Sequence, residues 1–230
     1  MPHSKKTRTK FTDGPEPRHI RKMRQARMEV AAEAARILAT EGQLNYHTAK
    51  KKAAERIGVS ARLGLPSNIE VKDALRSYQA LYGGTTHQQN IERLRSIAAR
   101  SMRLLESFQP RLVGSVLDGT ASAHARIALH IFADAVESLI LFLLEADIAF
   151  TQEQRQIRWF SGDYRLLPVV VIELDGVEIE LMVFDPVQLR QAPPSPIDGR
   201  PQHRASLSEV EHLLRERSAS STWDAFTTSS

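Results

Sequence analysis

The chain has 230 residues, of which 42% are hydrophobic and 25% are charged, and it contains no cysteine. This composition is typical of a globular protein, and it excludes disulfides and cysteine-ligated zinc within this sequence. No apolar run reaches the roughly 18–20 residues that a membrane helix needs, and the basic N-terminus lacks the apolar core of a signal peptide. We therefore expect a cytoplasmic protein with no membrane association.

Positive charge is concentrated near the N-terminus. The net charge is +4, but residues 1–60 carry 14 Lys/Arg against 6 Asp/Glu, whereas the remainder is acidic. Such a basic segment can meet the phosphates of a nucleic acid through salt-sensitive contacts. The segment is also consistent with a solvated surface, an interpretation favoured by the scarcity of aromatic residues for base stacking there.

The first half of the chain predicts helices. Residues 1–17 are polar and basic, contain Gly and Pro, and are expected to be disordered. A helical module is expected over residues 18–109. Apolar residues three to four positions apart, with Gly stops and a capping box at Ser67–Glu70, predict four helices. These helices are expected to run from Arg18 to before Gly42, from Thr48 to Ile57, from Ser67 to Gly83, and from about His87 to Phe108.

The second half, residues 110–217, predicts a small mixed β-sheet domain with two helices. The expected strands are Arg111–Leu117, Arg126–Ala133, Ile148–Trp159, Leu167–Leu174 and Val177–Phe184. Asp175-Gly176 is a hairpin turn signal between the last two strands. Asp134 is expected to cap a helix over Ala135–Ala146, and Ser206–Glu209 is a capping box that opens the last helix. Residues 218–230 are expected to be disordered, and the fold class is α+β.

The second half contains a Gly-Ser turn at a strand end, followed closely by a second strand. Gly114-Ser115 is expected at the end of one strand, and the next strand begins about ten residues later at Arg126. Val113–Ala121 and Arg126–Phe132 together resemble the nucleotidyltransferase superfamily. With the helical segment Ala49–Gly58 and the later strand hairpin, the chain more closely resembles uncharacterised proteobacterial nucleotidyltransferase-like proteins over most of residues 25–215.

The resemblance implies a phosphate-side turn and a metal site. Enzymes of this superfamily transfer a nucleoside monophosphate with two divalent ions, usually Mg²⁺, held by carboxylates. Gly114 and Ser115 match the phosphate-side turn of the nucleotide site. Arg126 and Ala128 stand where the paired aspartates belong, so the first metal ligands are missing. Glu180, two residues after Glu178, falls where the third carboxylate is expected.

Two hypotheses follow for this site, and whether the chain is an enzyme stays open. In the first, the metal site is degenerate, and the protein binds a nucleotide, a nucleic acid or a protein partner without catalysing transfer. Arg126 is then either a direct phosphate ligand or a surface arginine. In the second, the chain is an active enzyme with Mg²⁺ as cofactor. Its catalytic candidates are Glu178 and Glu180, with Asp118 or Asp134 as displaced carboxylates.

A third hypothesis is a DNA- or RNA-binding regulator that acts through the basic helical module. Its candidate contacts are Lys50, Lys51, Lys52 and Arg56, and such cations would meet phosphates rather than read bases. Trp159 and Tyr164 flank a polar turn, where they either pack in the core or stack on a base.

Overall fold

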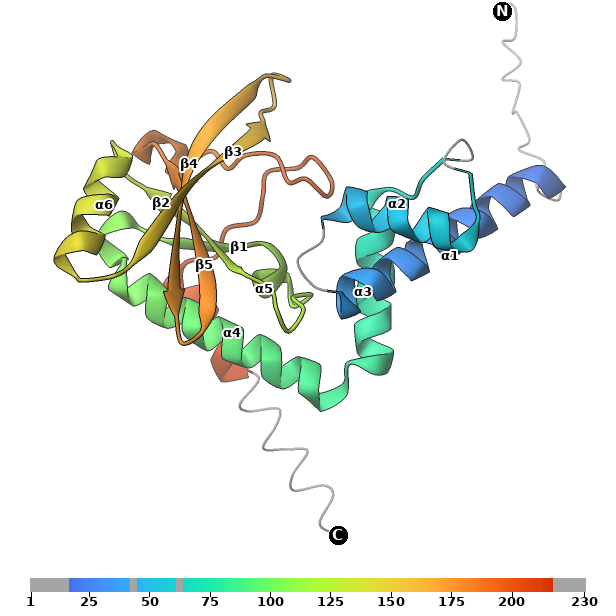
Figure 1. Ribbon diagram of the computed structural model, residues 1–230, viewed down its shortest axis with the longest axis horizontal. Coiled ribbons are helices and arrows are strands. Elements are labelled where there is room, and N and C mark those ends of the chain that lie inside the picture. Colours follow the sequence, from blue (N-terminus) through green and yellow to red (C-terminus); the bar gives the residue numbers. More distant parts are fainter. Residues whose placement is uncertain (1–16, 42–44, 61–63, 217–230) are drawn as a thin grey trace, which may run out of the picture.

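The computed structural model describes residues 17–41, 45–60 and 64–216 (Figure 1). The disorder predicted for residues 1–17 and 218–230 therefore falls, apart from Pro17, outside the described residues. Helices come first along the chain and a five-stranded mixed sheet follows, as predicted. None of the helices in the described part of the chain combines the length and the apolar character that a membrane crossing requires.

Three helices form the front of the molecule, which we call the helical front: α1 (Arg18–Thr40), α2 (Tyr46–Ile57) and α3 (Asn68–Tyr82). Small apolar side chains such as Ala34, Ala49 and Ala53 let α1 and α2 pack closely, and Val71 of α3 joins the same cluster. The predicted capping box of α3 is confirmed, with reciprocal hydrogen bonds between Ser67 and Glu70 at 3.2 and 2.6 Å. These contacts make the helical front a packed unit with its own small core.

The fourth helix, α4 (Gly84–Leu104), packs against the sheet. Its apolar side, which includes Ile91, Leu94 and Met102, shares one core with the sheet strands. A short 3₁₀ helix, η2 (Glu106–Phe108), follows it. The last helix of the predicted module 18–109 therefore belongs to the core of the sheet and lies along it (Figure 1).

The sheet has the strand order β1-β2-β5-β4-β3. Its strands are β1 (Arg111–Val113), β2 (Ile127–Phe132), β3 (Phe150–Arg158), β4 (Tyr164–Leu174) and β5 (Val177–Phe184). Only the β2–β5 pair is parallel. The predicted hairpin between β4 and β5 is confirmed: Asp175 and Gly176 have φ values of 52° and 71°, as a two-residue hairpin turn requires.

Two predicted features of this half are wrong. The first strand ends at Val113 instead of Leu117, because Gly114 has a φ of 74° and turns the chain into the short helix α5 (Gly114–Asp118). Val116 and Leu117 are buried by this helical turn. Asp134 does not cap α6 (Val136–Glu145), since the helix begins after Ala135 and has no side-chain cap.

Helices pack against one face of the sheet, whereas the other face carries the polar side chains of β5. Val177, Ile179, Leu181 and Val183 point from β5 into a core that α4, α6 and the helix over residues 207–216 complete. The predicted capping box of that last helix is confirmed, since Ser206 and Glu209 exchange hydrogen bonds. Glu178, Glu180 and Met182 lie on the opposite face, which we call the open face. The segment after β5, which starts with η3 (Pro186–Leu189), returns past this face toward the helical front (Figure 1).

Candidate functional site

Strand pairing brings the predicted site segments together on the open face. Val113 at the end of β1 lies opposite Ala128 of β2, and Ala128 lies opposite Glu180 of β5. The Gly114-Ser115 turn, the segment that opens at Arg126 and the glutamates of β5 are therefore neighbours, as the sequence predicted.

Side chains of α3 and α4 hold the turn that follows Ser115. Five of them reach residues 116–122, each within 2.7–3.2 Å of its acceptor: Lys72, Gln79, His87, Asn90 and Arg95. Four of the five bond to backbone carbonyls, whereas Lys72 bonds to the carboxylate of Asp118. Gly114 supplies the positive φ that starts the turn. The shape of the turn is thus set from outside the sheet.

Arg126 bridges the two glutamates of β5. Its Nε and Nη2 donate to the Glu178 carboxylate at 2.7 and 3.2 Å, and its Nη1 donates to Glu180 at 3.2 Å. The same Nη1 lies 3.8 Å from a Glu153 carboxylate oxygen. The residue is therefore held by carboxylates on the open face, and these contacts raise the pKa of the Arg126 guanidinium.

Arg155 holds Glu180 from the other side. Its two terminal nitrogens donate to the two carboxylate oxygens of Glu180 at 2.7 and 2.8 Å, which is a bidentate pair. Burial alone would raise the pKa of Glu180, but the hydrogen bonds and charges of Arg155 and Arg126 outweigh it and hold that pKa below its usual range. Glu180 is thus an ionised carboxylate between two guanidinium groups.

Arg155 is a residue of the site that local sequence patterns do not indicate. It lies on β3, and β4 separates β3 from β5 in the sheet, so Arg155 reaches Glu180 across an intervening strand. Such a pair leaves no signal in local sequence spacing. The alternation that places Glu153 and Arg155 on one face of a strand was the only pattern that could have indicated it.

The four carboxylates of the second hypothesis do not gather at one place. Glu178 and Glu180 meet, but on the Arg126 guanidinium. Asp118 pairs with Lys72 at 2.7 Å, and Asp134 lies beyond the end of β2, six residues after Ala128. Among the residues that the structure describes, no group of three or more His, Asp or Glu side chains is placed to hold a metal ion.

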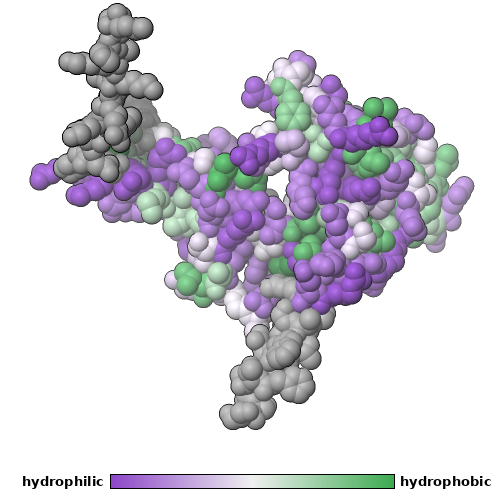
Figure 2. All heavy atoms as spheres, turned by 180° about the vertical axis from the view of Figure 1, so that it is seen from behind, coloured by the Kyte–Doolittle hydropathy of each residue, from purple (hydrophilic) through white to green (hydrophobic). Residues whose placement is uncertain are grey.

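A cleft lies between the helical front and the open face. It has a volume of about 650 Å³, within the range of small-molecule sites. From the sheet side it is lined by Ser115, Thr120, Ser122, Ala125, Arg126, Arg155 and Glu180, and from the helical front by Leu38, Asn45, Tyr46 and Leu75. The space-filling view shows a narrow gap between the two parts of the molecule (Figure 2). We call this space the interdomain cleft.

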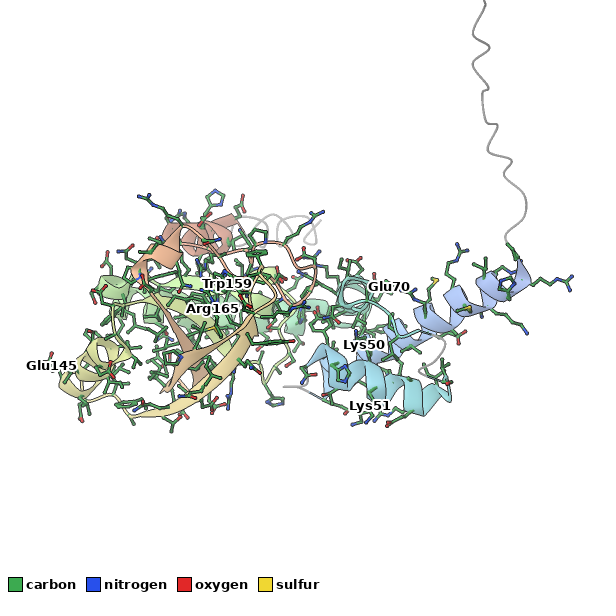
Figure 3. All side chains as sticks on the ribbon, turned by 90° about the horizontal axis from the view of Figure 1, so that it is seen from above. Lys50, Lys51, Glu70, Glu145, Trp159 and Arg165 are labelled. Carbon is green, nitrogen blue, oxygen red and sulfur yellow. The ribbon has the colours of Figure 1, made fainter. Side chains whose placement is uncertain are left out.

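A second cavity of about 720 Å³ adjoins the cleft, and Arg155 and Glu180 line both. Its walls come from the end of β1, from the β3 tip around Phe160 and from the proline-rich segment 193–202. Trp159 is 7% exposed, and the Arg165 guanidinium lies 4.5 Å from its ring centre. Both residues are labelled in Figure 3. We call this space the proline-loop cavity.

The candidate nucleic-acid contacts of α2 are mostly engaged within the protein. Lys50 donates to the Pro66 carbonyl at 3.0 Å and to the Asn68 side chain at 2.7 Å, and burial lowers its pKa. Lys52 pairs with Glu41. Arg56 pairs with Glu41 at 2.8 Å and with Glu33 at 3.2 Å. Lys51 is exposed, on the same helix as Lys50 (Figure 3).

Lys50 also connects the helical front to the wall of the proline-loop cavity. Asn68, which accepts from Lys50, donates from its own amide nitrogen to the Pro196 carbonyl at 2.7 Å. The lysine is thus part of a chain of hydrogen bonds that fixes the segment over the open face.

No model of a known protein family matches this chain, and no curated protein sequence is significantly similar to it.

Proposed function

We propose that this chain is a nucleotidyltransferase-like protein that binds a nucleotide in the interdomain cleft without catalysing nucleotidyl transfer. The observation that carries the proposal is the position of Arg126, whose guanidinium bridges Glu178 and Glu180. In the superfamily that the sequence resembles, acidic side chains at positions 126, 128 and 180 would hold metal ions. In this chain the singly charged guanidinium of Arg126 lies between Glu178 and Glu180, where the resemblance would lead one to expect metal ions.

Electrostatics supports a metal-free site. Two unit charges 4 Å apart repel by about 4 kcal/mol at an effective dielectric of 20, so the Arg126 guanidinium by itself would repel a dication at that distance by about 8 kcal/mol. Its salt bridges also occupy the Glu178 and Glu180 oxygens that would otherwise attract the ion. Glu180 is already neutralised by two guanidinium groups. Mg²⁺ requires oxygen ligands in near-octahedral order, and Ala128 supplies none.

The cleft offers donors for a phosphate. Contacts with Glu178 and Glu180 use three of the five N–H donors of Arg126, which leaves two for a ligand. Ser115 is exposed at the cleft wall, and Ser122 lines the same wall. These groups can bind phosphate oxygens without a bridging metal.

The proposal is tested by calorimetry with AMP in EDTA and in Mg²⁺. We expect equal affinity in both. The double variant Arg126→Asp/Ala128→Asp should lose the binding in EDTA and gain Mg²⁺ binding. The control Arg103→Asp changes an exposed arginine of α4 that pairs with Glu211 and should behave like wild type. Mg²⁺-dependent transfer by the wild-type chain that disappears in Glu180→Gln would instead establish an active enzyme.

A second candidate function is nucleic-acid binding by the first turns of α1. Residues 18–28 carry five Lys/Arg and no Asp/Glu, and Arg18, Arg21, Lys22 and Arg24 are exposed. This part of α1 extends beyond the packed helices of the front (Figure 1). The observation favours α1 over α2 as the basic surface of the module.

Salt dependence tests this candidate. Each phosphate contact contributes about −0.9 to the slope of log K against log salt for duplex DNA. Changing Arg18, Arg21, Lys22 and Arg24 to Ala should therefore flatten the slope by about 3.6, whereas Lys51→Ala should change it by at most about 0.9. Equal slopes for wild type and the α1 variant would exclude this surface.

A further inference from the structure

We infer that the ligand of the site is a nucleoside carrying at most one phosphate, and that its base lies in the proline-loop cavity against Phe160. This inference rests on the proposed function and names the ligand class and the place of the base. It joins the two cavities into one binding site with a polar end and an aromatic end.

The charges around Arg126 favour a ligand of low charge. Two guanidinium groups, Arg126 and Arg155, face three carboxylates, Glu153, Glu178 and Glu180, within 4 Å. The local balance is therefore slightly negative. A triphosphate would bring three to four further negative charges without the metal ions that usually neutralise them. A ligand with one phosphate, or with none, adds the least negative charge to this cluster.

The two cavities adjoin at the Arg155–Glu180 pair, so one ligand could reach from one into the other beside that pair. Arg155 and Glu180 line both, and no bulky side chain stands at Gly114 or Ala128, which line the proline-loop cavity beside them. A Cβ placed on Gly114 would meet no atom within 4 Å. An aspartate at position 128 would fill part of this space, so the small side chain found there opens the passage.

The proline-loop cavity has the lining of a base site. Phe160 is 48% exposed at its wall, with its ring edge-on to Trp159 at 6.4 Å between ring centres. Ile157, Met182 and Pro194 add apolar surface, and Gln202 adds an amide for hydrogen bonds. Solvent-exposed aromatic rings at a wall are stacking surfaces that accept any base.

The test compares adenosine, AMP and ATP by calorimetry on the full chain in EDTA. We expect AMP and adenosine to bind with affinities within about tenfold of each other, and ATP to bind no more tightly than AMP. The chain has two tryptophans, Trp159 and Trp223, so Trp223→Phe makes Trp159 the sole fluorescent reporter. We expect AMP to change the Trp159 emission.

Two exposed aromatics of the same hairpin give a matched pair of variants. Phe160→Ala should weaken AMP binding about fivefold or more, as the loss of one stacking ring does. Tyr164→Ala should leave AMP binding unchanged, because Tyr164 is 63% exposed at the start of β4 and is absent from the described lining of the cavity. Both changes are at exposed positions, so both variants should fold.

The outcomes separate this inference from the proposed function. One outcome would overturn the inference and leave the proposed function standing. In it, AMP binding is lost in Arg126→Asp/Ala128→Asp but unchanged in Phe160→Ala, and the Trp159 emission stays constant. Binding of ATP more than tenfold tighter than AMP would also overturn the inference alone. The proposed role of the cleft would be overturned if adenosine and AMP bound with quenching of Trp159 and their binding were unaffected in Arg126→Asp/Ala128→Asp. The absence of binding by all three compounds would overturn both.

Discussion

Replacing Arg126 by Ala tests whether its bridge to Glu178 and Glu180 stabilises the sheet. The Glu178 carboxylate is 42% exposed, so that pair should contribute less than about 1 kcal/mol. Glu180 is 12% exposed, and losing a charge-assisted hydrogen bond there should cost about 1.5 kcal/mol. We therefore expect the free energy of unfolding to fall by about 2 kcal/mol, which lowers Tm by about 4–8 °C in a chain of this size.

Urea unfolding of a double-mutant cycle measures this interaction directly. With Arg126→Ala, Glu180→Gln and the double variant, we expect a coupling free energy of about 1 kcal/mol. Arg103→Ala, which removes an exposed pair with Glu211, should cost less than about 0.5 kcal/mol. A coupling below about 0.3 kcal/mol would refute the expectation that the Arg126–Glu180 pair stabilises the sheet.

The same interaction has a defined pH dependence. The pKa of Glu180 is lowered in the folded state, because Arg155 and Arg126 outweigh the effect of burial. The carboxylate therefore contributes stability above its unfolded pKa, and that contribution is lost as pH falls through the folded pKa. The stability difference between wild type and Arg126→Ala should shrink as pH falls below about 4.5.

Three further predictions concern the surroundings of the site. Gly114→Ala should destabilise the fold by about 1–2 kcal/mol in thermal unfolding, because Gly114 has a φ of 74°, and an unchanged Tm would contradict this. Lys50→Ala should lower stability by about 1 kcal/mol, because it breaks the bonds to Pro66 and Asn68, whereas Lys51→Ala should be neutral in the same urea titration. Burial, and then the charge of Arg204, lower the pKa of His130 to about 3. Stability should therefore fall by up to about 1.4 kcal/mol per pH unit below about pH 6.5 for this group. Urea unfolding across that range should show a weaker dependence in His130→Gln, and parallel curves would show that His130 is not buried in its neutral form.

Patterns with a fixed period or a local cap were sufficient to predict most of the fold. The alternation over Val177–Phe184 predicted β5 and the face that carries its glutamates, and Asp175-Gly176 predicted the turn before it. The Ser67 capping box predicted the start of α3. Each of these signals lies within a few residues of the structure that it specifies, so one sequence contains it in full.

The features that the sequence did not predict depend on contacts between distant segments. The polar face of α2 predicted an exposed basic surface, but Lys50 turns toward Asn68 and the proline-rich segment. The apolar residues after Val113 looked like a longer strand, because the positive φ of Gly114 has no signature beyond the glycine itself. Arg155 acts on a strand that is not its neighbour. Such contacts are decided by how elements pack, which local spacing does not encode.

The hold of α3 and α4 on residues 116–122 has a consequence for how the protein can be divided or can diverge. A fragment that begins at residue 110 would keep every strand, yet it would lose all five side chains that shape the turn after Ser115. Replacing the helical front alone would remove only Lys72 and Gln79, because His87, Asn90 and Arg95 belong to α4. The turn after Ser115 therefore keeps its full set of supports only when α3 and α4 both stay with the sheet.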